Sequence, residues 1–403
     1  MADLEARYRG IFGDDGPVRI VCGPGRVNLI GEHTDYNGGF VMPMALDVAV
    51  RLALVPRDEP ATAGKPTVTL WSEQFDERAE FTLGDAEPPD APHWLRYPMK
   101  VAEVLAQEGL GLRGFSAVLD GNVPIGSGLS SSAACEVASA LAFLVAARPD
   151  VPAGPAGVAA EAHGLSTCRL AQLCQQAEHR VGVRGGIMDQ FVSLHGRVGH
   201  AILLDCRDLS YQTMPLPTDE VEVIIIDSAV PRRLTEGAYN ERRSQCEEGV
   251  GRLRKFDASI EQLRDVSLDL FEAHKAALPK TVRRRCRHVI TENTRVLESA
   301  EAMKAGDLVR FGELLNASHD SLRDDYEVSR PELDLLVEIA RGVKGVLGSR
   351  LTGAGFGGCT VTLARPEAVE PLREAVLARY EKETGLVPHI WVSEAAAGAT
   401  IEV

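Results

Sequence analysis

Short runs of β-branched or alternating apolar residues mark the first quarter of the chain and predict strands. These runs cover 19–22, 48–55 and 67–71 and, further along, 115–119, 201–205 and 221–227. Helices are predicted at 94–107, 130–147 and 166–180, and a Pro/Gly-rich stretch at 149–157 indicates a surface excursion between the last two.

The second half has a different pattern. Residues 234–341 are mostly helical in pattern, with acidic and basic residues interspersed. The end of the chain then predicts a strand at 359–363, a helix at 367–384 and a strand at 389–392. Together with the length of 403 residues, this predicts an α+β fold of two domains, 1–195 and 196–403.

Composition and charge narrow the range of partners. Hydrophobic residues at 45% and charged residues at 25% exclude a disordered or collagen-like chain. The 43 Lys and Arg residues against 58 Asp and Glu residues give a net charge of −15. Such a field repels polyanions, so we expect neither nucleic acid nor a membrane surface as a partner. A small anion would need a local site of positive potential.

The sequence also bears on location. Residues 1–7 lack the basic and apolar run of a signal peptide, and the apolar run 137–147 is shorter than the ~20 residues of a spanning helix. The eight cysteines include no C-x-x-C pair, which argues against a zinc ribbon or a disulfide scaffold. We therefore expect a cytoplasmic protein.

The first segment with candidate chemistry is 25–39, which reads GRVNLIGEHTDYNGG and follows a predicted strand. Its four glycines allow tight turns. Its short carboxylates, imidazole and amides suit a ligand with many hydroxyl groups, because hydroxyls both donate and accept hydrogen bonds. The alternative is a polar turn with surface charges.

The second segment, 123–134, reads VPIGSGLSSSAA. A strand leads into a glycine-containing loop and then into a serine-rich helix N-terminus. Free amides and the helix dipole make such an end a site for anions, and glycine lets the backbone approach phosphate oxygens. The alternative is a helix that serine merely caps. Three serines after Gly-Ser-Gly favour the anion site.

The third segment, 351–359, reads LTGAGFGGC, in which Gly353, Gly355 and Gly358 satisfy G-x-G-x-x-G. A dinucleotide-binding loop requires a helix after the glycines, whereas a strand is predicted here. On its own the segment indicates a tight glycine hairpin.

Together the three segments resemble the three motifs of the GHMP small-molecule kinases. The first segment, extended to residue 43 by Phe-Val-Met-Pro, is similar to the galactokinase signature. GGIMDQF at 185–191 and YNERR at 239–243, followed by Gln245, Cys246 and Glu247, are similar to further segments of that family. The likeness runs from about residue 8 to about residue 395. It implies the two-domain GHMP architecture with the active site in the inter-domain cleft.

The resemblance also implies roles. The reaction would transfer the ATP γ-phosphoryl group to the anomeric hydroxyl of galactose, with Mg²⁺ as cofactor and a monomeric chain. Asp189 would be the catalytic carboxylate, and Arg26 would lie beside the transferred group. Mg²⁺ would be held by Ser132 and Glu178. Sugar hydroxyls would be held by Glu32, His33, Thr34, Asp35, Gly186, Asp189 and Tyr239. The nucleotide would be held by Ser72, Trp94, Gly126, Ser127, Gly128, Leu129, Ser130, Ser131 and Ser132.

Plainer roles remain open for single residues. Glu178 could be a surface acid on its helix, Tyr239 could be core packing, and Asp189 could cap a helix. His33 could donate to a backbone carbonyl.

Other functions also remain open. The same cluster could serve a kinase for N-acetylgalactosamine or arabinose. A non-catalytic sensor of galactose and ATP, or a dinucleotide-dependent oxidoreductase suggested by the third segment, belong to other classes.

Overall fold

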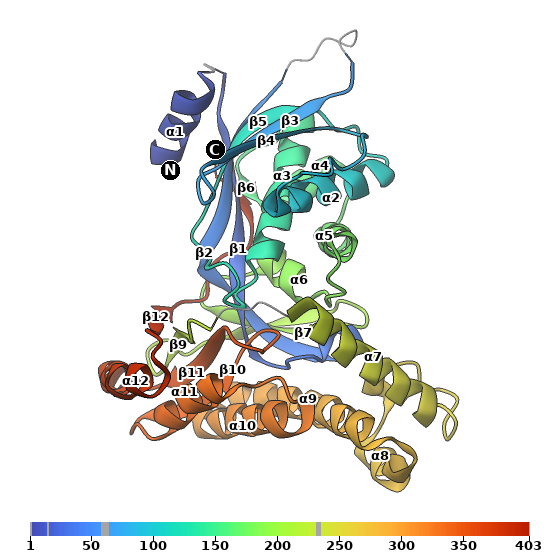
Figure 1. The fold of residues 1–403 in the computed structure, drawn as a ribbon, viewed down its shortest axis with the longest axis vertical. Coiled ribbons are helices and arrows are strands. Elements are labelled where there is room, and N and C mark those ends of the chain that lie inside the picture. Colours follow the sequence, from blue (N-terminus) through green and yellow to red (C-terminus); the bar gives the residue numbers. More distant parts are fainter. Residues whose placement is uncertain (1, 14–15, 58–63, 231–234, 403) are drawn as a thin grey trace.

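The computed structural model describes residues 2–13, 16–57, 64–230 and 235–402. These residues form two lobes, with the long strands β1 and β2 running from the upper lobe into the lower one (Figure 1). The upper lobe contains α1 (Ala2–Phe12), β1 (Arg19–Ile30), β2 (Phe40–Pro56), β3 (Thr67–Ser72), β4 (Glu77–Thr82), α2 (His93–Gln107), β5 (Phe115–Gly121), α3 (Ser131–Ala147), β6 (Gly154–Pro155), α4 (Ala156–Ala162), α5 (Thr167–Val181) and α6 (Met188–His195).

The chain then passes mainly into the lower lobe. Its strands and helices are β7 (His200–Asp205), β8 (Tyr211–Pro215), β9 (Glu222–Asp227), α7 (Thr235–Leu253), α8 (Leu268–His274), α9 (Lys280–Ala305), α10 (Leu308–Ser321), α11 (Pro331–Arg341), β10 (Val346–Leu351), β11 (Cys359–Ala364), α12 (Val369–Thr384), β12 (His389–Ser393) and β13 (Thr400–Ile401). Short turns of helix follow β1, precede and follow α8, and lie after α10 and before α12: η1 (Asp35–Asn37), η2 (Leu263–Asp265), η3 (Lys275–Ala277), η4 (Leu322–Tyr326) and η5 (Pro366–Ala368).

The first sheet has the order β4-β3-β5-β2-β1-β13-β6 across the described residues, with β7 and β8 attached through β2. Helix α3 packs against β1 and β2 and is buried along 133–146, because nearly all of its side chains are apolar or small. Helix α1 packs on β2 and β5. Both faces of the central strands are therefore covered, and 11 of the 12 residues of β1 are buried.

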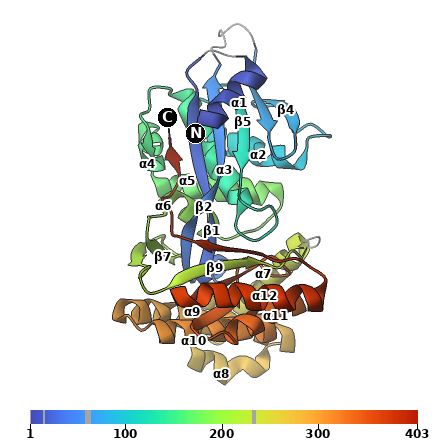
Figure 2. The same cartoon turned by 90° about the vertical axis from the view of Figure 1, so that its left-hand side faces the viewer.

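The second sheet has the order β10-β11-β9-β12, and each of these pairs is antiparallel. Helices α9, α10, α11 and α12 lie along it in the lower lobe (Figures 1 and 2). Helix α10 contacts β10 closely, since an added Cβ at Gly312 would lie 2.2 Å from the carbonyl oxygen of Leu347. This contact fixes β10, which carries one wall of the site described below.

The α+β fold and most predicted elements are confirmed. Strands β1 and β2 are longer than predicted: β1 continues to residue 30 rather than ending at 22, and β2 begins at residue 40 rather than 48. In β1 the reason is local. Its Gly-Pro-Gly segment hides the apolar pattern, and the pairing with β2 shifts register between Pro24 and Arg26. The boundary near residue 195 stays a prediction. Strands β7, β8 and β13 lie beyond that residue and join the first sheet.

No helix in the described ranges is both long and apolar enough to cross a membrane.

Gly312→Ala should destabilise the protein by about 1–3 kcal/mol, because the new methyl group would overlap the β10 backbone. Alanine otherwise stabilises a helix by up to ~1 kcal/mol relative to glycine, so the sign of the change is diagnostic. Urea unfolding followed by circular dichroism would measure it. Gly251→Ala on α7 is the matched control, since nothing lies within 4 Å of its added Cβ. Equal stabilisation of both variants would contradict the close packing.

Candidate active site

A cavity of about 700 Å³ brings together residues from most of the sequence motifs. Its walls include, of the predicted site residues, Arg26, Glu32, His33, Asp35, Trp94, Gly126, Gly128, Ser130, Ser131, Ser132, Glu178, Gly186, Asp189 and Tyr239. Gly353 and Ala354 of the third segment line it as well. The cavity therefore lies where β1, the N-terminus of α3, α6, α7 and the β10–β11 loop meet.

Arg26 joins three of these segments. Its Nε and Nη2 donate to the two carboxylate oxygens of Asp189 over 2.7 and 2.6 Å, and its Nη1 donates to the carbonyl of Gly128 over 2.5 Å. The Arg26 amide donates to the carbonyl of Leu129 over 3.0 Å. Burial opposes the charge of the guanidinium, but the carboxylates of Asp189, Glu32 and Asp35 together outweigh it and raise the pKa of Arg26. Arg26 thus links β1 to the serine-rich loop and to α6.

Two glycines of β1 let that loop approach. An added Cβ at Gly25 would lie 2.8 Å from the carbonyl oxygen of Leu129, and one at Gly23 would lie 2.4 Å from that of Ala134. A side chain at either position would push α3 away from the strand. The two glycines therefore allow the serine-rich loop and the start of α3 to lie close against β1.

Helix α3 begins without a side-chain cap. Ser130 precedes the helix in the left-handed conformation (φ 63°), and its hydroxyl donates to Asp189 rather than to the helix amides. The interpretation that serine merely caps the helix is therefore wrong for Ser130. The first-turn amides and the helix dipole favour an anion at this end, and Ser131 and Ser132 line the cavity beside it.

One end of the cavity is polar. Asp35 starts the turn η1, and its Oδ1 accepts a hydrogen bond from the Tyr36 amide over 2.9 Å. An added Cβ at Gly186 would lie 1.9 Å from Asp35 Oδ2, so only glycine leaves room for this carboxylate. Burial, assisted by the charge of Asp189, raises the pKa of Asp35 to about 7. Tyr239 of α7 closes this end, with its ring 5.3 Å from that of Tyr36.

His33 is held as a neutral ring. Its Nε2 lies 3.2 Å from the carbonyl of Ala354 and donates to it, while Nδ1 accepts from the Tyr36 hydroxyl over 2.8 Å. Burial lowers the pKa of His33 well below its ordinary value. His33 thus makes the backbone contact of its plainer predicted role and also lines the cavity.

The third segment is a hairpin between the antiparallel strands β10 and β11, as its glycines predict. Its Gly353 amide donates to Oε1 of Glu32 over 2.7 Å. A strand follows the glycines where a dinucleotide-binding unit has a helix, so the oxidoreductase alternative does not fit this loop.

The opposite end of the cavity is apolar. Trp94 stacks with Phe75 at 9° between ring planes and donates its Nε1 to Glu77 over 2.8 Å. This end is also lined by Val50, Tyr97, Leu119, Val123 and Ile125. The sequence predicted only Trp94, because the others come from separate elements and share no spacing. A flat apolar ligand group would fit between these walls.

Acidic groups crowd the floor near Ser132. Its hydroxyl lies 3.4 Å from Oε1 of Glu178, and Gln190 donates to both Glu178 and Glu136 over 3.2 and 2.9 Å. Burial and the charge of Asp189 raise the pKa of Glu178 to about 8. A cation would offset the negative charge of these carboxylates. Hydroxyl and carboxylate oxygens are ligands that Mg²⁺ binds alongside phosphate oxygens and water. The donor pair therefore fits Mg²⁺, although the described residues contain no larger His/Cys/Asp/Glu cluster for a metal.

Four predicted ligands do not line the cavity. The Thr34 hydroxyl donates to the backbone carbonyls of Gly31 and Phe40, and Ser127 donates to that of Pro124. Leu129 and Ser72 are fully buried. Thr34, Ser127 and Leu129 shape the loops that carry the other residues, and the structure gives Ser72 no place in the cavity wall.

Comparisons with known proteins identify the family of the chain. Residues 6–56 match the model of the galactokinase galactose-binding signature, 96–197 that of the GHMP kinases N-terminal domain and 299–382 that of the GHMP kinases C-terminal domain. The chain is 43% identical over 397 residues to the galactokinase of Roseiflexus sp. RS-1, covering 98% of this chain and 96% of that protein.

The chain belongs to the galactokinase family. The galactokinase of Homo sapiens is also 43% identical, over 407 residues that cover all of this chain and 96% of that protein. The crystal structure of Lactococcus lactis galactokinase complexed with galactose is 36% identical, with a TM-score of 0.90 and coverage of 100% and 99%. Methanococcus jannaschii mevalonate kinase, at 17% identity and a TM-score of 0.62 over 95% and 100% of the chains, shares the fold.

Asp35→Asn should stabilise the ligand-free protein. A raised carboxyl pKa means that the folded protein keeps a proton which the unfolded chain releases, so stability falls as pH rises from about 4 to about 7. Asparagine removes this penalty and still accepts from the Tyr36 amide. We expect a gain of about 2 kcal/mol at pH 8, half of what the full shift implies because Asp35 is partly exposed, and a smaller gain at pH 5.

Urea unfolding at the two pH values would measure the gain. Asp205→Asn is the matched control, because Asp205 is paired with Arg264 over 2.7 and 2.8 Å and its loss should destabilise the protein. An Asp35→Asn protein less stable than wild type at both pH values would contradict the burial argument.

Proposed function

We propose that this chain transfers the γ-phosphoryl group of ATP to the anomeric hydroxyl of D-galactose and releases α-D-galactose 1-phosphate. The observation that carries this proposal is the position of Asp189. Its carboxylate lies between the polar end of the cavity and the uncapped N-terminus of α3. A carboxylate at this position would contact both a sugar hydroxyl at the polar end and the phosphates at the helix N-terminus. The galactokinases of 36–43% identity, one of them described with galactose bound, support this choice of sugar.

The residue roles follow from the same geometry. The apolar end, with Trp94, would take the adenine, and the amides of α3 would hold the phosphates. Asp35, Glu32 and His33 would bind sugar hydroxyls at the polar end. Ser132 and Glu178 would hold Mg²⁺, which when bound supplies charge neutralisation at the phosphate oxygens.

Catalysis would rest mainly on positioning and charge. Phosphoryl transfer passes through a loose transition state, so the attacking hydroxyl keeps its proton until late. Asp189, held by both oxygens against Arg26, would orient that hydroxyl and accept its proton at the end of the transfer. Arg26 would also offset charge on the moving phosphoryl group.

We further propose a cytoplasmic location and a monomeric chain. The eight cysteines are all free thiols, as in a reducing compartment. Sedimentation analysis would test the subunit count.

Turnover on a sugar panel tests the function. Galactose should be phosphorylated with a kcat/KM well above those for N-acetylgalactosamine and arabinose, because the family signature that matches this chain is that of galactose binding. Phosphorus NMR of the product should show a 1-phosphate. Binding of galactose and ATP without turnover would favour the sensor, and a better rate on another panel sugar would reassign the substrate.

Asp189→Asn should lower kcat by ~10²–10⁴-fold, the usual contribution of a positioned general base, and change the KM for galactose much less. Steady-state kinetics would separate the two constants. Asp208→Asn, a turn residue whose carboxylate contacts the nearby Ser210, is the control that should keep kcat. Near-full kcat in the Asp189→Asn protein would overturn its assigned role.

A further inference from the structure

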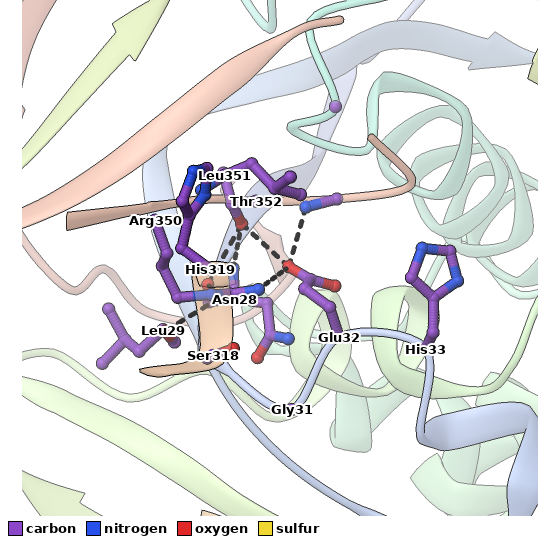
Figure 3. A network of polar contacts seen from close by, with 12 residues as sticks. Asn28, Leu29, Gly31, Glu32, His33, Ser318, His319, Arg350, Leu351 and Thr352 are labelled. Carbon is purple, nitrogen blue, oxygen red and sulfur yellow. Dashed lines mark hydrogen bonds and ion pairs between the residues drawn. The ribbon is translucent and has the colours of Figure 1, made fainter. Parts of the chain in front are cut away.

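Arg350 of β10 is a charged side chain that the mechanism above does not use, and it is fully buried. Its Nη1 donates to the carbonyls of Asn28 and Leu29, each over 2.9 Å, and its Nη2 forms an ion pair with Oε1 of Glu32 at 3.2 Å (Figure 3). The two carbonyls lie near the end of β1. The guanidinium is therefore fixed to the strand that leads into the first motif.

Within the described part of the chain, the hydrogen bonds and the ion pair of the Glu32 side chain fall on one oxygen. Oε1 accepts from the Gly353 amide over 2.7 Å, lies 3.1 Å from the Thr352 hydroxyl and pairs with Arg350. Figure 3 shows Oε2 directed away from this group of donors. Since Glu32 lines the cavity, Oε2 is the oxygen that a ligand can reach.

The backbone around Glu32 is held by other residues. The Gly31 amide donates to Oε1 of Glu292 over 3.0 Å, and His288 donates its Nε2 to the Glu32 carbonyl over 3.0 Å. Both partners belong to α9 rather than β10. Loss of Arg350 would therefore remove the cationic partner of the Glu32 carboxylate, whereas these two backbone contacts next to Glu32 would remain.

We propose that Arg350 is a positioning residue, which holds Glu32 so that its second carboxylate oxygen faces the sugar. This inference rests on the proposed function of the cavity. A buried carboxylate that loses its cationic partner is costly, so Glu32 would turn away in the absence of Arg350. This change removes the acceptor from the sugar subsite and leaves the nucleotide end untouched.

Arg350→Met should raise the KM and the calorimetric Kd for galactose by about tenfold and keep the KM for ATP within about twofold. Arg350→Lys keeps the charge but cannot reach both carbonyls and Glu32 together, so we expect an intermediate value. The Arg350→Lys variant also provides the test if the Arg350→Met variant does not fold. A purely structural role would lower the midpoint of thermal unfolding of both variants and leave the sugar constants unchanged.

A double-mutant cycle decides whether Arg350 acts through Glu32. In a Glu32→Gln background, Arg350→Met or Arg350→Lys should raise the sugar KM no further, because the positioned group is already altered. An equal additional rise would overturn the inference.

Arg341→Met is the matched control. Arg341 lies on α11 in the same lobe and donates twice to Asn316 over 2.7 Å, so its loss should lower thermal stability and keep both KM values. A wild-type protein that phosphorylates no panel sugar would overturn the proposed function and this inference with it. An active wild type with unchanged sugar constants in both Arg350 variants would overturn the inference alone.

Discussion

The bidentate ion pair between Arg26 and Asp189 is the constraint on which the rest of the site depends. The Arg26 guanidinium contacts the carboxylate of α6 and the carbonyl of Gly128, and the Arg26 backbone amide donates to the carbonyl of Leu129. These groups are separated by up to 163 residues along the chain. Because Arg26 is buried and Asp189 is only partly exposed, the pair has a more defined geometry than a surface ion pair. The helix end and the carboxylate are therefore placed relative to each other before any ligand binds.

Residues within the three motifs divide into those that face the cavity and those that shape its walls. The hydroxyls of Thr34 and Ser127 donate to nearby carbonyls, whereas Asp35 and Ser130 line the cavity. The sequence of a motif does not distinguish residues that face the cavity from residues that shape its walls, because the same loop requires both. This is why the family resemblance assigned Thr34, Ser127 and Leu129 to ligands, although none of the three lines the cavity.

Much of the fold was predictable where a local pattern exists. Helix α3 and strand β9 are continuous apolar runs, and the glycine hairpin was expected from its own residues and from the strand that follows it. Strands β6 and β13 were not predictable, since two residues carry no periodicity. Arg350 and the apolar residues around Trp94 were missed for a related reason. Their roles depend on contacts with residues that are distant in the sequence, and such contacts leave no pattern of residue spacing.

The position of β13 has a consequence for biosynthesis. Residues 400–401 pair with β1 on one side and with β6 on the other, inside a sheet whose remaining strands are made early. Until residues 400–401 have been made, that side of β1 has no partner. An unpaired strand edge invites association with other chains, so the nascent protein carries an exposed edge at β1 until this segment emerges. Completion of the sheet thus waits for a strand that is made long after β1.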